Sequence, residues 1–396
     1  MTQQQRSILA VAMLTQGVSV GMTFGILPVF LQPLESAFDA PRTQIASGQI
    51  LLMFALTVGS ILTGAALDRG YARRVMMGGA CLMTAALGVA SQAPNLWVLG
   101  FAALMAGFSI PSIGPLAAAS LVTRAFEDER GRALGLMSMG PPLGSGAFAL
   151  IAGWALLTLE WRQTLLIFAA LAALLMIPLI WIVVPARFDS GNDSSASESK
   201  AAPAVSMAGM VRMPVFLWSA GVFAIAAGIS SGWTTHVAAY LNGAGLDDAQ
   251  ASTWLAAQYW MGVPGAVVFG TLADRLGLTT LFIAMLGTAA SCFGLLALSP
   301  DPVVIKAACV MFGFSFGGII PLYMMLLGAR MGPDAFGRAM GLSNLMMLPV
   351  VFGSVMLAAS VFEATGGYSS ALTVFAVGLL LAIGCLFGSN WSAQKA

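Results

Sequence analysis

Apolar residues occur along this chain in long runs that are separated by short polar segments. The runs are 18 to 28 residues long. As a helix rising 1.5 Å per residue, each run can cross a hydrocarbon core about 30 Å thick. The pattern therefore predicts twelve transmembrane helices, at residues 8–31, 44–67, 75–93, 97–123, 133–158, 164–184, 214–241, 251–273, 281–298, 304–329, 340–362 and 370–389.

The composition agrees with a chain surrounded by a lipid bilayer. Hydrophobic residues make up 59% of the 396 positions and charged residues 8%, whereas soluble domains carry roughly a quarter charged residues. No basic patch suggests nucleic acid as a partner. The cysteines lack metal-ligand spacing, so we expect no metal, cofactor or disulfide at Cys81, Cys292, Cys309 and Cys385.

The positions of Lys and Arg predict the orientation, because cytoplasmic loops retain positive charge. With both termini inside, Arg42, Arg162 and Lys306 lie outside, and the other fourteen of the 17 cations are cytoplasmic. We therefore expect a multi-pass plasma (inner) membrane protein with cytoplasmic N- and C-termini. The fourteen are Arg6, Arg69, Arg73, Arg74, Arg124, Arg130, Arg132, Arg187, Lys200, Arg212, Arg275, Arg330, Arg338 and Lys395.

A polar segment in the middle of the chain divides the predicted helices into two sets of six. Residues 189–204 contain no large aliphatic side chain, so they cannot pack a core and are expected to form a flexible linker. The expected organisation is an N-terminal six-helix bundle at 1–188, a cytoplasmic linker at 189–212 and a C-terminal six-helix bundle at 213–396.

The two halves repeat each other in one register, with an offset of 206 residues. Asp68-Arg69 recurs as Asp274-Arg275, and Arg124 recurs as Arg330. Two longer blocks follow the same offset: Gly107-Phe108-Ser109 with Gly313-Phe314-Ser315, and the six residues from Gly131 with the six from Gly337. The halves are therefore copies in the same orientation, which is typical of carriers with a central site between parallel repeats.

Over essentially its whole length the chain resembles the major facilitator superfamily. The loop motif G-x-L-a-D-R-x-G of that family is intact at 270–277. In the first half it is altered, since Gly70-Tyr71 replaces an arbitrary residue followed by glycine. The resemblance implies an all-α fold of twelve transmembrane helices in two parallel six-helix repeats.

Within the superfamily, one stretch resembles the helix 4–5 signature of bacterial monocarboxylate porters. It runs from Arg130 through Gly135, Gly140 and Gly144, with Trp161-Arg162 after the helix. The helix 1 signature of those porters is absent from residues 8–25. The positions expected to hold their cations align near Ala266 and Gly25, which are uncharged, so transport of simple monocarboxylates does not carry over.

The duplicated loop motif is the first set of candidate functional residues. Its aspartates lie at the cytoplasmic ends of helices 2 and 8, where they can pair with arginine or cap a helix N-terminus. The family resemblance implies that the motif is a conformational latch; the alternative is ordinary cytoplasmic loop charge. The latch residues are Gly64, Asp68, Arg69, Arg73, Arg74, Gly270, Asp274, Arg275 and Gly277.

No carboxylate lies in the middle of a predicted span, because all sixteen Asp and Glu residues fall in loops or at helix ends. Proton-coupled carriers commonly use an embedded acid or histidine. His236 on helix 7, with a reference pKa of about 6.5, is therefore the candidate for proton coupling. The alternatives are a residue of the outer gate held by hydrogen bonds, or one that reaches water.

Neutral polar side chains within the spans are the candidates for binding a substrate. In hydrocarbon such groups face protein or a cavity, and the alternative role for each is a hydrogen bond between helices. The candidates for the substrate cavity are Gln16, Thr23, Ser230, Trp233, Thr234, Gln258, Tyr259, Trp260, Tyr323 and Asn344.

These observations predict a secondary active transporter, because no GxxxxGK[ST] loop is present to hold a nucleotide. The expected substrate is a small organic solute, for example a carboxylate or another organic anion, moved by alternating access with a proton or sodium ion, as in symport. We expect the protein to work as a monomer and not to be an enzyme, since embedded acids are missing. The alternatives are an efflux pump for amphipathic compounds and a transport-inactive membrane receptor.

Overall fold

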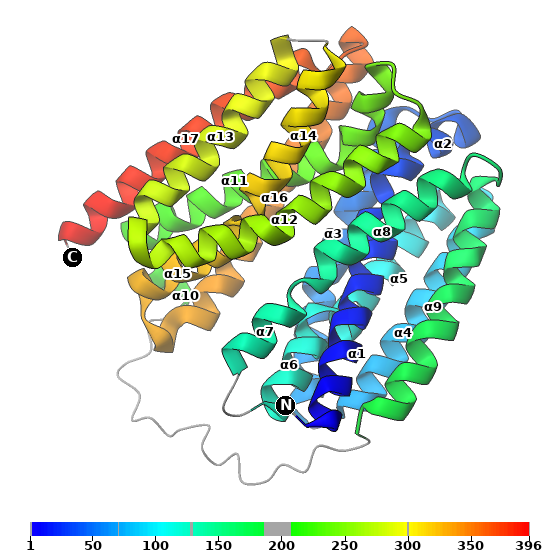
Figure 1. Cartoon of the computed structure of the whole chain (residues 1–396), viewed down its shortest axis with the longest axis horizontal. Helices are drawn as coiled ribbons and strands as arrows, with labels where there is room; N and C mark the ends of the chain where they lie inside the picture. The colour runs from blue at the N-terminus through cyan, green and yellow to red at the C-terminus, as the bar shows by residue number, and fades with distance from the viewer. Residues whose placement is uncertain (1, 70, 127–129, 186–206, 299–300, 396) are drawn as a thin grey trace. The chain divides into compact units, whose positions relative to one another are not determined.

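The computed structural model describes residues 2–69, 71–126, 130–185, 207–298 and 301–395 (Figure 1). Within these ranges the ordered elements are helices, and no strand occurs. Eleven helical segments of the described residues are long and apolar enough to cross a membrane. The 29-residue helix α12 occupies the position of the remaining predicted span, so the all-α fold with twelve transmembrane helices is confirmed.

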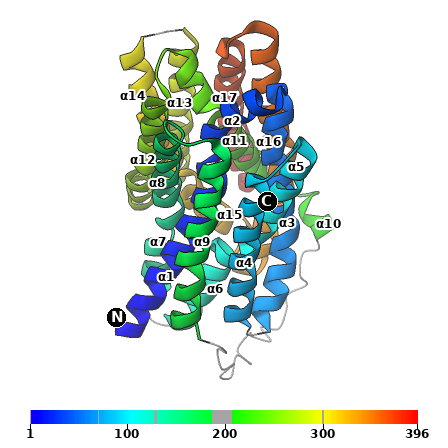
Figure 2. The same cartoon turned by 90° about the vertical axis from the view of Figure 1, so that its right-hand side faces the viewer.

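The first six predicted spans form the helices α1 to α9, several of which are pieces of one span. Span 1 is a continuous helical stack, and spans 4 and 5 are each built from two helices. The bounds are α1 (Gln3–Val20), the π-helical η1 (Gly21–Gly25), α2 (Leu27–Phe38), α3 (Arg42–Asp68), α4 (Ala72–Ser91), α5 (Leu96–Ile113), α6 (Pro115–Ala125), α7 (Arg130–Met137), α8 (Gly140–Ala155) and α9 (Trp161–Val183). Both views show α9 running along α4 (Figures 1 and 2).

The second six spans follow the same plan, with span 10 divided in two. The linker predicted at 189–212 lies largely outside the described residues, and its described end holds the short helix α10. The bounds are α10 (Met207–Met210), α11 (Pro214–Gly243), α12 (Asp248–Leu276), α13 (Leu278–Leu298), α14 (Pro302–Gly317), α15 (Ile319–Met331), α16 (Pro333–Thr365) and α17 (Ser369–Lys395).

Proline and glycine explain why span 4 breaks. Gly114 separates α5 from α6 with φ −95° and ψ −140°, which is outside the helical region, and Pro115 begins α6. A proline has no N–H for the helix ladder and disfavours the helical conformation in the residue before it. Backbone groups near the break are therefore not all used by the helix.

The π-helical segment η1 lies where the first span crosses α8 at very short range. A Cβ atom on Gly21 would lie 2.6 Å from the carbonyl oxygen of Gly144, and one on Gly25 would lie 2.7 Å from Cα of Ser145. Only glycine permits this approach, and small residues at helix crossings are the usual means by which membrane helices pack closely.

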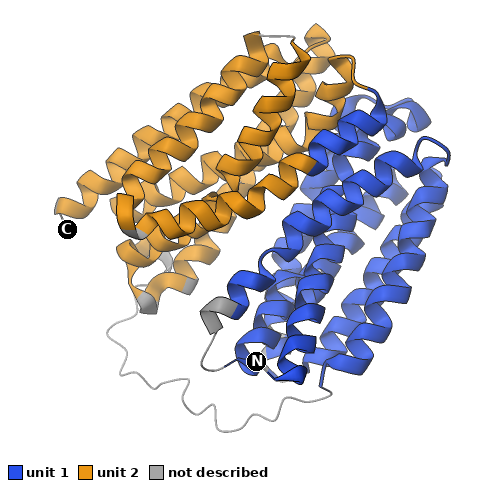
Figure 3. Cartoon of the chain, viewed as in Figure 1, with its two compact units in different colours: residues 1–193, 247–256 blue, residues 194–246, 257–396 orange. Residues whose placement is uncertain are grey.

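The chain forms two compact units (Figure 3). The first comprises residues 1–193 with 247–256, and the second comprises 194–246 with 257–396. The first turns of α12 therefore group with the first unit. Within this unit, a Cβ atom on Gly153 of α8 would lie 1.8 Å from the hydroxyl oxygen of Ser252.

The 206-residue register of the sequence repeat is reproduced in the tertiary contacts, which confirms the two parallel repeats. In the first unit, a Cβ atom on Gly107 would lie 2.4 Å from the carbonyl oxygen of Leu52. In the second, a Cβ atom on Gly313 would lie 2.0 Å from the carbonyl oxygen of Gln258. Both residues of the second contact are 206 positions after those of the first. The same offset relates the contact of Gly59 with Phe108 to that of Gly265 with Phe314.

Candidate functional site

Gln16 is the substrate-cavity candidate whose surroundings are most unusual. Its side chain on α1 is 2% exposed, and its amide nitrogen Nε2 has no hydrogen-bond acceptor within the described part of the chain. Leaving a buried donor without a partner costs roughly 1–3 kcal/mol. Thr23 in η1, by contrast, is satisfied locally, because its hydroxyl donates to the carbonyl oxygen of Ser19 at 2.7 Å.

Two helix breaks of the first unit lie close to Gln16. A Cβ atom on Gly140, the first residue of α8, would lie 3.3 Å from Cβ of Gln16. One turn along α1, the hydroxyl oxygen of Ser19 would lie 2.8 Å from a Cβ atom on Gly114, at the break between α5 and α6. Interrupted membrane helices supply backbone groups for ligands. Gln16 therefore combines an available donor with the local structure of a binding site.

The structure brings two candidates of the second unit into direct contact. The indole nitrogen of Trp233 on α11 donates to Oε1 of Gln258 on α12 at 2.9 Å. Trp233 is 2% exposed, and its ring meets those of Phe293 and Phe312 at centroid distances of 5.6 and 6.1 Å. This environment favours the alternative role for the pair, a hydrogen bond that joins helices inside the core.

The remaining candidates of the second unit take no part in that hydrogen bond. Tyr323 is fully buried; its hydroxyl donates to Ser343 on α16, and its ring stacks on Phe223 at a centroid distance of 4.3 Å. Ser230, Thr234 and Tyr259 are half-buried, whereas Trp260 and Asn344 are exposed. The candidates therefore do not form one cluster in either unit.

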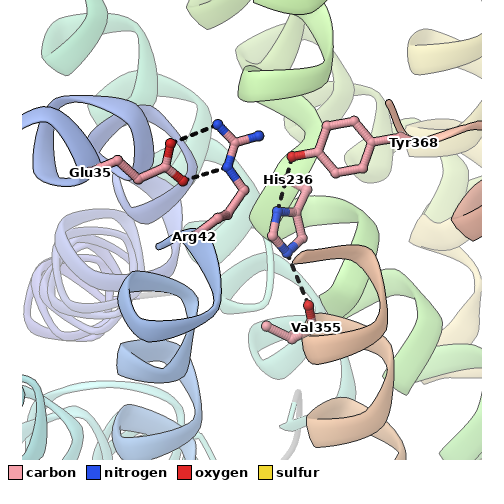
Figure 4. A network of polar contacts seen from close by, with 5 residues as sticks. All are labelled: Glu35, Arg42, His236, Val355 and Tyr368. Atoms are coloured by element: carbon pink, nitrogen blue, oxygen red, sulfur yellow. Dashed lines mark hydrogen bonds and ion pairs between the residues drawn. The ribbon is translucent and has the colours of Figure 1, made fainter. Parts of the chain in front are cut away.

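His236 on α11 contacts α16 and the residue that precedes α17, all in the second unit (Figure 4). Its ring is 1% exposed. Nε2 lies 3.1 Å from the carbonyl oxygen of Val355 on α16, and Nδ1 lies 3.3 Å from the hydroxyl of Tyr368. A carbonyl oxygen only accepts, so Nε2 carries the hydrogen. Tyr368 can then donate to Nδ1 of the neutral ring or accept from Nδ1–H of the charged ring.

The aspartates of the predicted latch, Asp68 and Asp274, have side chains outside the described residues. Arg73 is described, and its Nε donates to the carbonyl oxygen of Val184 at the end of α9 at 2.6 Å. Its guanidinium also lies 5.1 Å from the centroid of the Trp181 ring. A cation at a helix C-terminus is favourable, so Arg73 has a capping role that the motif alone does not indicate. The latch stays a prediction.

The two copies of the loop motif end in different backbone conformations. Gly277, the last residue of the second copy, has φ +80°. Tyr71 stands at the matching position of the first copy with φ −88°, because a side chain disfavours the left-handed region. The guanidinium of Arg74 lies 5.3 Å from the Tyr71 ring centroid. The altered sequence of the first copy therefore coincides with a different backbone conformation at this position.

An ion pair at the junction of α2 and α3 was not singled out by the sequence (Figure 4). Arg42 and Glu35 form a two-pronged pair, in which Nη2 of Arg42 lies 2.7 Å from Oε2 of Glu35. Their side chains are 8% and 17% exposed. Asp39 between them has φ +47°, which turns the chain back on itself. The sequence held one indication of this ion pair: Arg42 is one of only three cations that are expected on the outer side of the membrane.

Comparison with known proteins identifies the family to which the chain belongs. The sequence profile of the Major Facilitator Superfamily matches residues 12–351. The chain belongs to this superfamily. The major facilitator protein is therefore a multi-pass membrane transporter and not an enzyme. Among the described residues, no group of three or more His, Cys, Asp or Glu side chains is placed to hold a metal ion.

Two curated relatives of this major facilitator protein are similar over most of their length. An uncharacterized transporter of the superfamily from Escherichia coli strain K12, YhjX, is 25% identical over 320 residues, which cover 79% of this chain and 78% of the relative. Monocarboxylate transporter 13 of Bos taurus is 24% identical over 378 residues, which cover 92% and 85%.

Solved structures share the fold at low sequence identity. A bacterial homolog of the human lysosomal transporter Spinster, in an inward-facing and unoccupied conformation, has a TM-score of 0.81 at 13% identity and covers 100% of this chain and 98% of its own. A D-xylose–proton symporter has a TM-score of 0.79 at 15% identity, covering 96% and 97%. These likenesses show the major facilitator fold.

Proposed function

We propose that this protein is a secondary active transporter that moves a small organic solute by alternating access, and that Gln16 donates a hydrogen bond to an oxygen of that solute. The observation that carries the proposal is the buried Nε2 of Gln16, which meets no acceptor among the described residues. A bound carbonyl, carboxylate or hydroxyl oxygen would remove that penalty. Because Gln16 is buried, the solute reaches it in another state of the transport cycle.

We propose a carboxylate or another organic anion as the solute class. The similarity to a monocarboxylate transporter over 92% of this chain supports this class. A neutral amide binds an anion by one hydrogen bond rather than by the two-pronged contact of arginine. The bound group is therefore expected to be held less tightly than in a site with an embedded arginine.

A ligand screen followed by a flux assay tests the proposed function. Purified protein is screened by thermal shift against organic acids, amino acids and amphipathic drugs, because a ligand that binds the folded state raises its apparent stability. Hits are then assayed in proteoliposomes with imposed proton and sodium gradients. Gradient-driven uptake of an organic acid supports the proposal. Export of amphipathic drugs with no response to organic acids would establish the efflux alternative instead.

Substitution of Gln16 by leucine is expected to raise the KM for the solute by about tenfold, the factor given by one lost hydrogen bond of about 1.4 kcal/mol. The melting temperature should stay constant or rise, since the change removes an unpaired buried donor. Gln258→Leu is the matched control. It removes the acceptor of the Trp233 indole, so it should lower the melting temperature and leave KM unchanged. An unaltered KM in Gln16→Leu would refute the role of Gln16.

We propose that transport is coupled to protons and that His236 exchanges the proton. The contact between Nδ1 and the Tyr368 hydroxyl supports this role, because that hydroxyl suits either protonation state. Tyr368 also lines a cavity of about 280 Å³, which gives that side chain a connection to open space. We propose symport in the plasma (inner) membrane, by a monomer with cytoplasmic termini.

Substitution of His236 by glutamine is expected to abolish proton-driven accumulation of the solute in proteoliposomes while exchange of solute between the two sides continues. The reason is that glutamine retains a donor for the Val355 carbonyl and does not titrate near neutral pH. Tyr368→Phe serves as the control. It removes the hydroxyl that contacts Nδ1 but keeps the imidazole, so proton-driven accumulation should continue. If His236→Gln still accumulates solute in response to a pH gradient, His236 is a hydrogen-bonded gate residue and not the coupling group.

A further inference from the structure

The first unit contains a cavity of about 770 Å³ that the proposed transport mechanism does not use. Its walls come from η1, α2, α3, α4, α5 and the first turns of α9. The lining residues of these segments lie in the half of the unit where α2 ends and α3 begins. Gln16 and the helix breaks beside it are not among the lining residues. The predicted substrate-cavity candidate that does line the cavity, Thr23, donates its hydroxyl to its own helix, so this cavity is distinct from the site proposed around Gln16.

The depth of the cavity matches one leaflet of a bilayer. Along α3 the lining runs from Gln44 to Leu52, and along α5 it runs from Leu96 to Ala106. At 1.5 Å per residue these stretches rise about 12 and 15 Å. Half of a hydrocarbon core about 30 Å thick is about 15 Å. The cavity thus extends from the expected membrane surface to the middle of the bilayer.

The lining is mostly apolar, and its polar side chains are Gln44, Ser47 and Thr23. Gln44 and Ser47 lie in the first two turns of α3, and the hydroxyl of Ser47 donates to the carbonyl oxygen of Gln44 at 2.6 Å. The polar group at the deep end, Thr23, donates to its own helix. The hydroxyls of Ser47 and Thr23 therefore already have acceptors, and the remaining wall is formed mainly by alanine, leucine and aromatic side chains.

The cavity opens on the side of α5 that faces away from the core. Trp97 and Phe101 belong to its lining and are 89% and 59% exposed. In a membrane-spanning segment, exposed apolar side chains of this kind contact lipid, and tryptophan favours the interface at the end of a span. The molecules that surround such an opening are therefore phospholipids, whose chains already run parallel to its long dimension.

We propose that this cavity binds one acyl chain of a membrane phospholipid. Entry of the chain fills apolar volume that would otherwise lack contacts and requires no polar group to leave water. The nearby guanidinium of Arg42 is already paired with Glu35, so the acyl chain, rather than the charge of the headgroup, determines binding.

Photolabelling of the full-length protein tests the proposal. The protein is reconstituted with phosphatidylcholine that carries a diazirine on one acyl chain, irradiated and mapped by peptide mass spectrometry. Labelled peptides are expected from α3 and α5. Gly48→Phe should reduce this labelling by about tenfold, corresponding to a loss of binding of about 1.4 kcal/mol, because Gly48 lines the cavity and an added Cβ meets open space.

Gly88→Phe on α4 is the matched control, since Gly88 also has open space around an added Cβ but is not part of the lining. It should label like the unaltered protein. Ala103 of α5 also lines the cavity, so Ala103→Phe replaces Gly48→Phe if that variant does not fold. Phosphatidylglycerol that carries the same diazirine chain should label α3 and α5 to the same extent as phosphatidylcholine, because the headgroup charge does not determine binding. The proposal would be overturned if a folded Gly48→Phe or Ala103→Phe variant were labelled on α3 and α5 as strongly as the unaltered protein. It would also be overturned if the labels were confined to other helices.

Discussion

Replacing Gly144 with valine is expected to destabilise the first unit by about 3 kcal/mol or more, the upper range for overpacked cores. A Cβ atom at this position would lie 2.0 Å from the carbonyl oxygen of Gly17 and 2.4 Å from its Cα. These are backbone atoms, so no side chain can rotate away to make room. The helices α1 and α8 must then separate along their whole crossing, which also displaces Gln16 from the start of α8.

The measurement is the yield of monodisperse protein and its melting temperature in detergent, for Gly144→Val beside Gly88→Val. The control adds the same side chain at a position where a Cβ meets open space. We expect the control to stay within about 0.5 kcal/mol of the unaltered protein, the usual range for substitutions that disturb no contact. Equal stability of the two variants would show that the crossing is looser than the structure describes.

Substitution of Arg42 by glutamine is expected to destabilise the protein by about 3 kcal/mol, because it leaves the largely buried carboxylate of Glu35 without its partner. The pair is well screened from water, with side chains 8% and 17% exposed. It also joins the end of α2 to the start of α3, so its loss releases the turn that contains Asp39.

A double-mutant cycle separates the interaction from the effects of each change. Glu35→Gln, Arg42→Gln and the double variant are compared by thermal or denaturant unfolding. We expect the double variant to be more stable than Arg42→Gln, since it no longer holds an uncompensated charge. If the two single effects simply add, the ion pair contributes nothing and the contact is incidental.

The sequence was a good guide to the helices and a poor guide to the partners of polar side chains. Long apolar runs predict spans reliably, because a backbone in hydrocarbon must satisfy its hydrogen bonds internally. The ends were less predictable: α16 begins at Pro333, seven residues before the expected start at 340, since a helix can continue past the apolar run that identifies it.

The candidate site shows the same difference at the level of single residues. Trp233 and Gln258 were both chosen as polar groups in a span, but they bond to each other across two helices. Gln16 was chosen on the same grounds and has no acceptor among the described residues. Residue type and helical position are alike in these cases. What differs is whether the neighbouring helix presents a hydrogen-bond partner, and the local sequence does not specify which helix is the neighbour.

The sequence by itself determined that this chain is a membrane-spanning carrier built from two copies of a six-helix unit, because hydrophobic length and the 206-residue repeat are properties of the linear chain. Only the tertiary structure decided which buried polar groups are already bonded, which glycines permit helices to touch, and which side chains line a cavity in the first unit. Those properties depend on distances between residues far apart in sequence, and such distances exist only once the helices have packed.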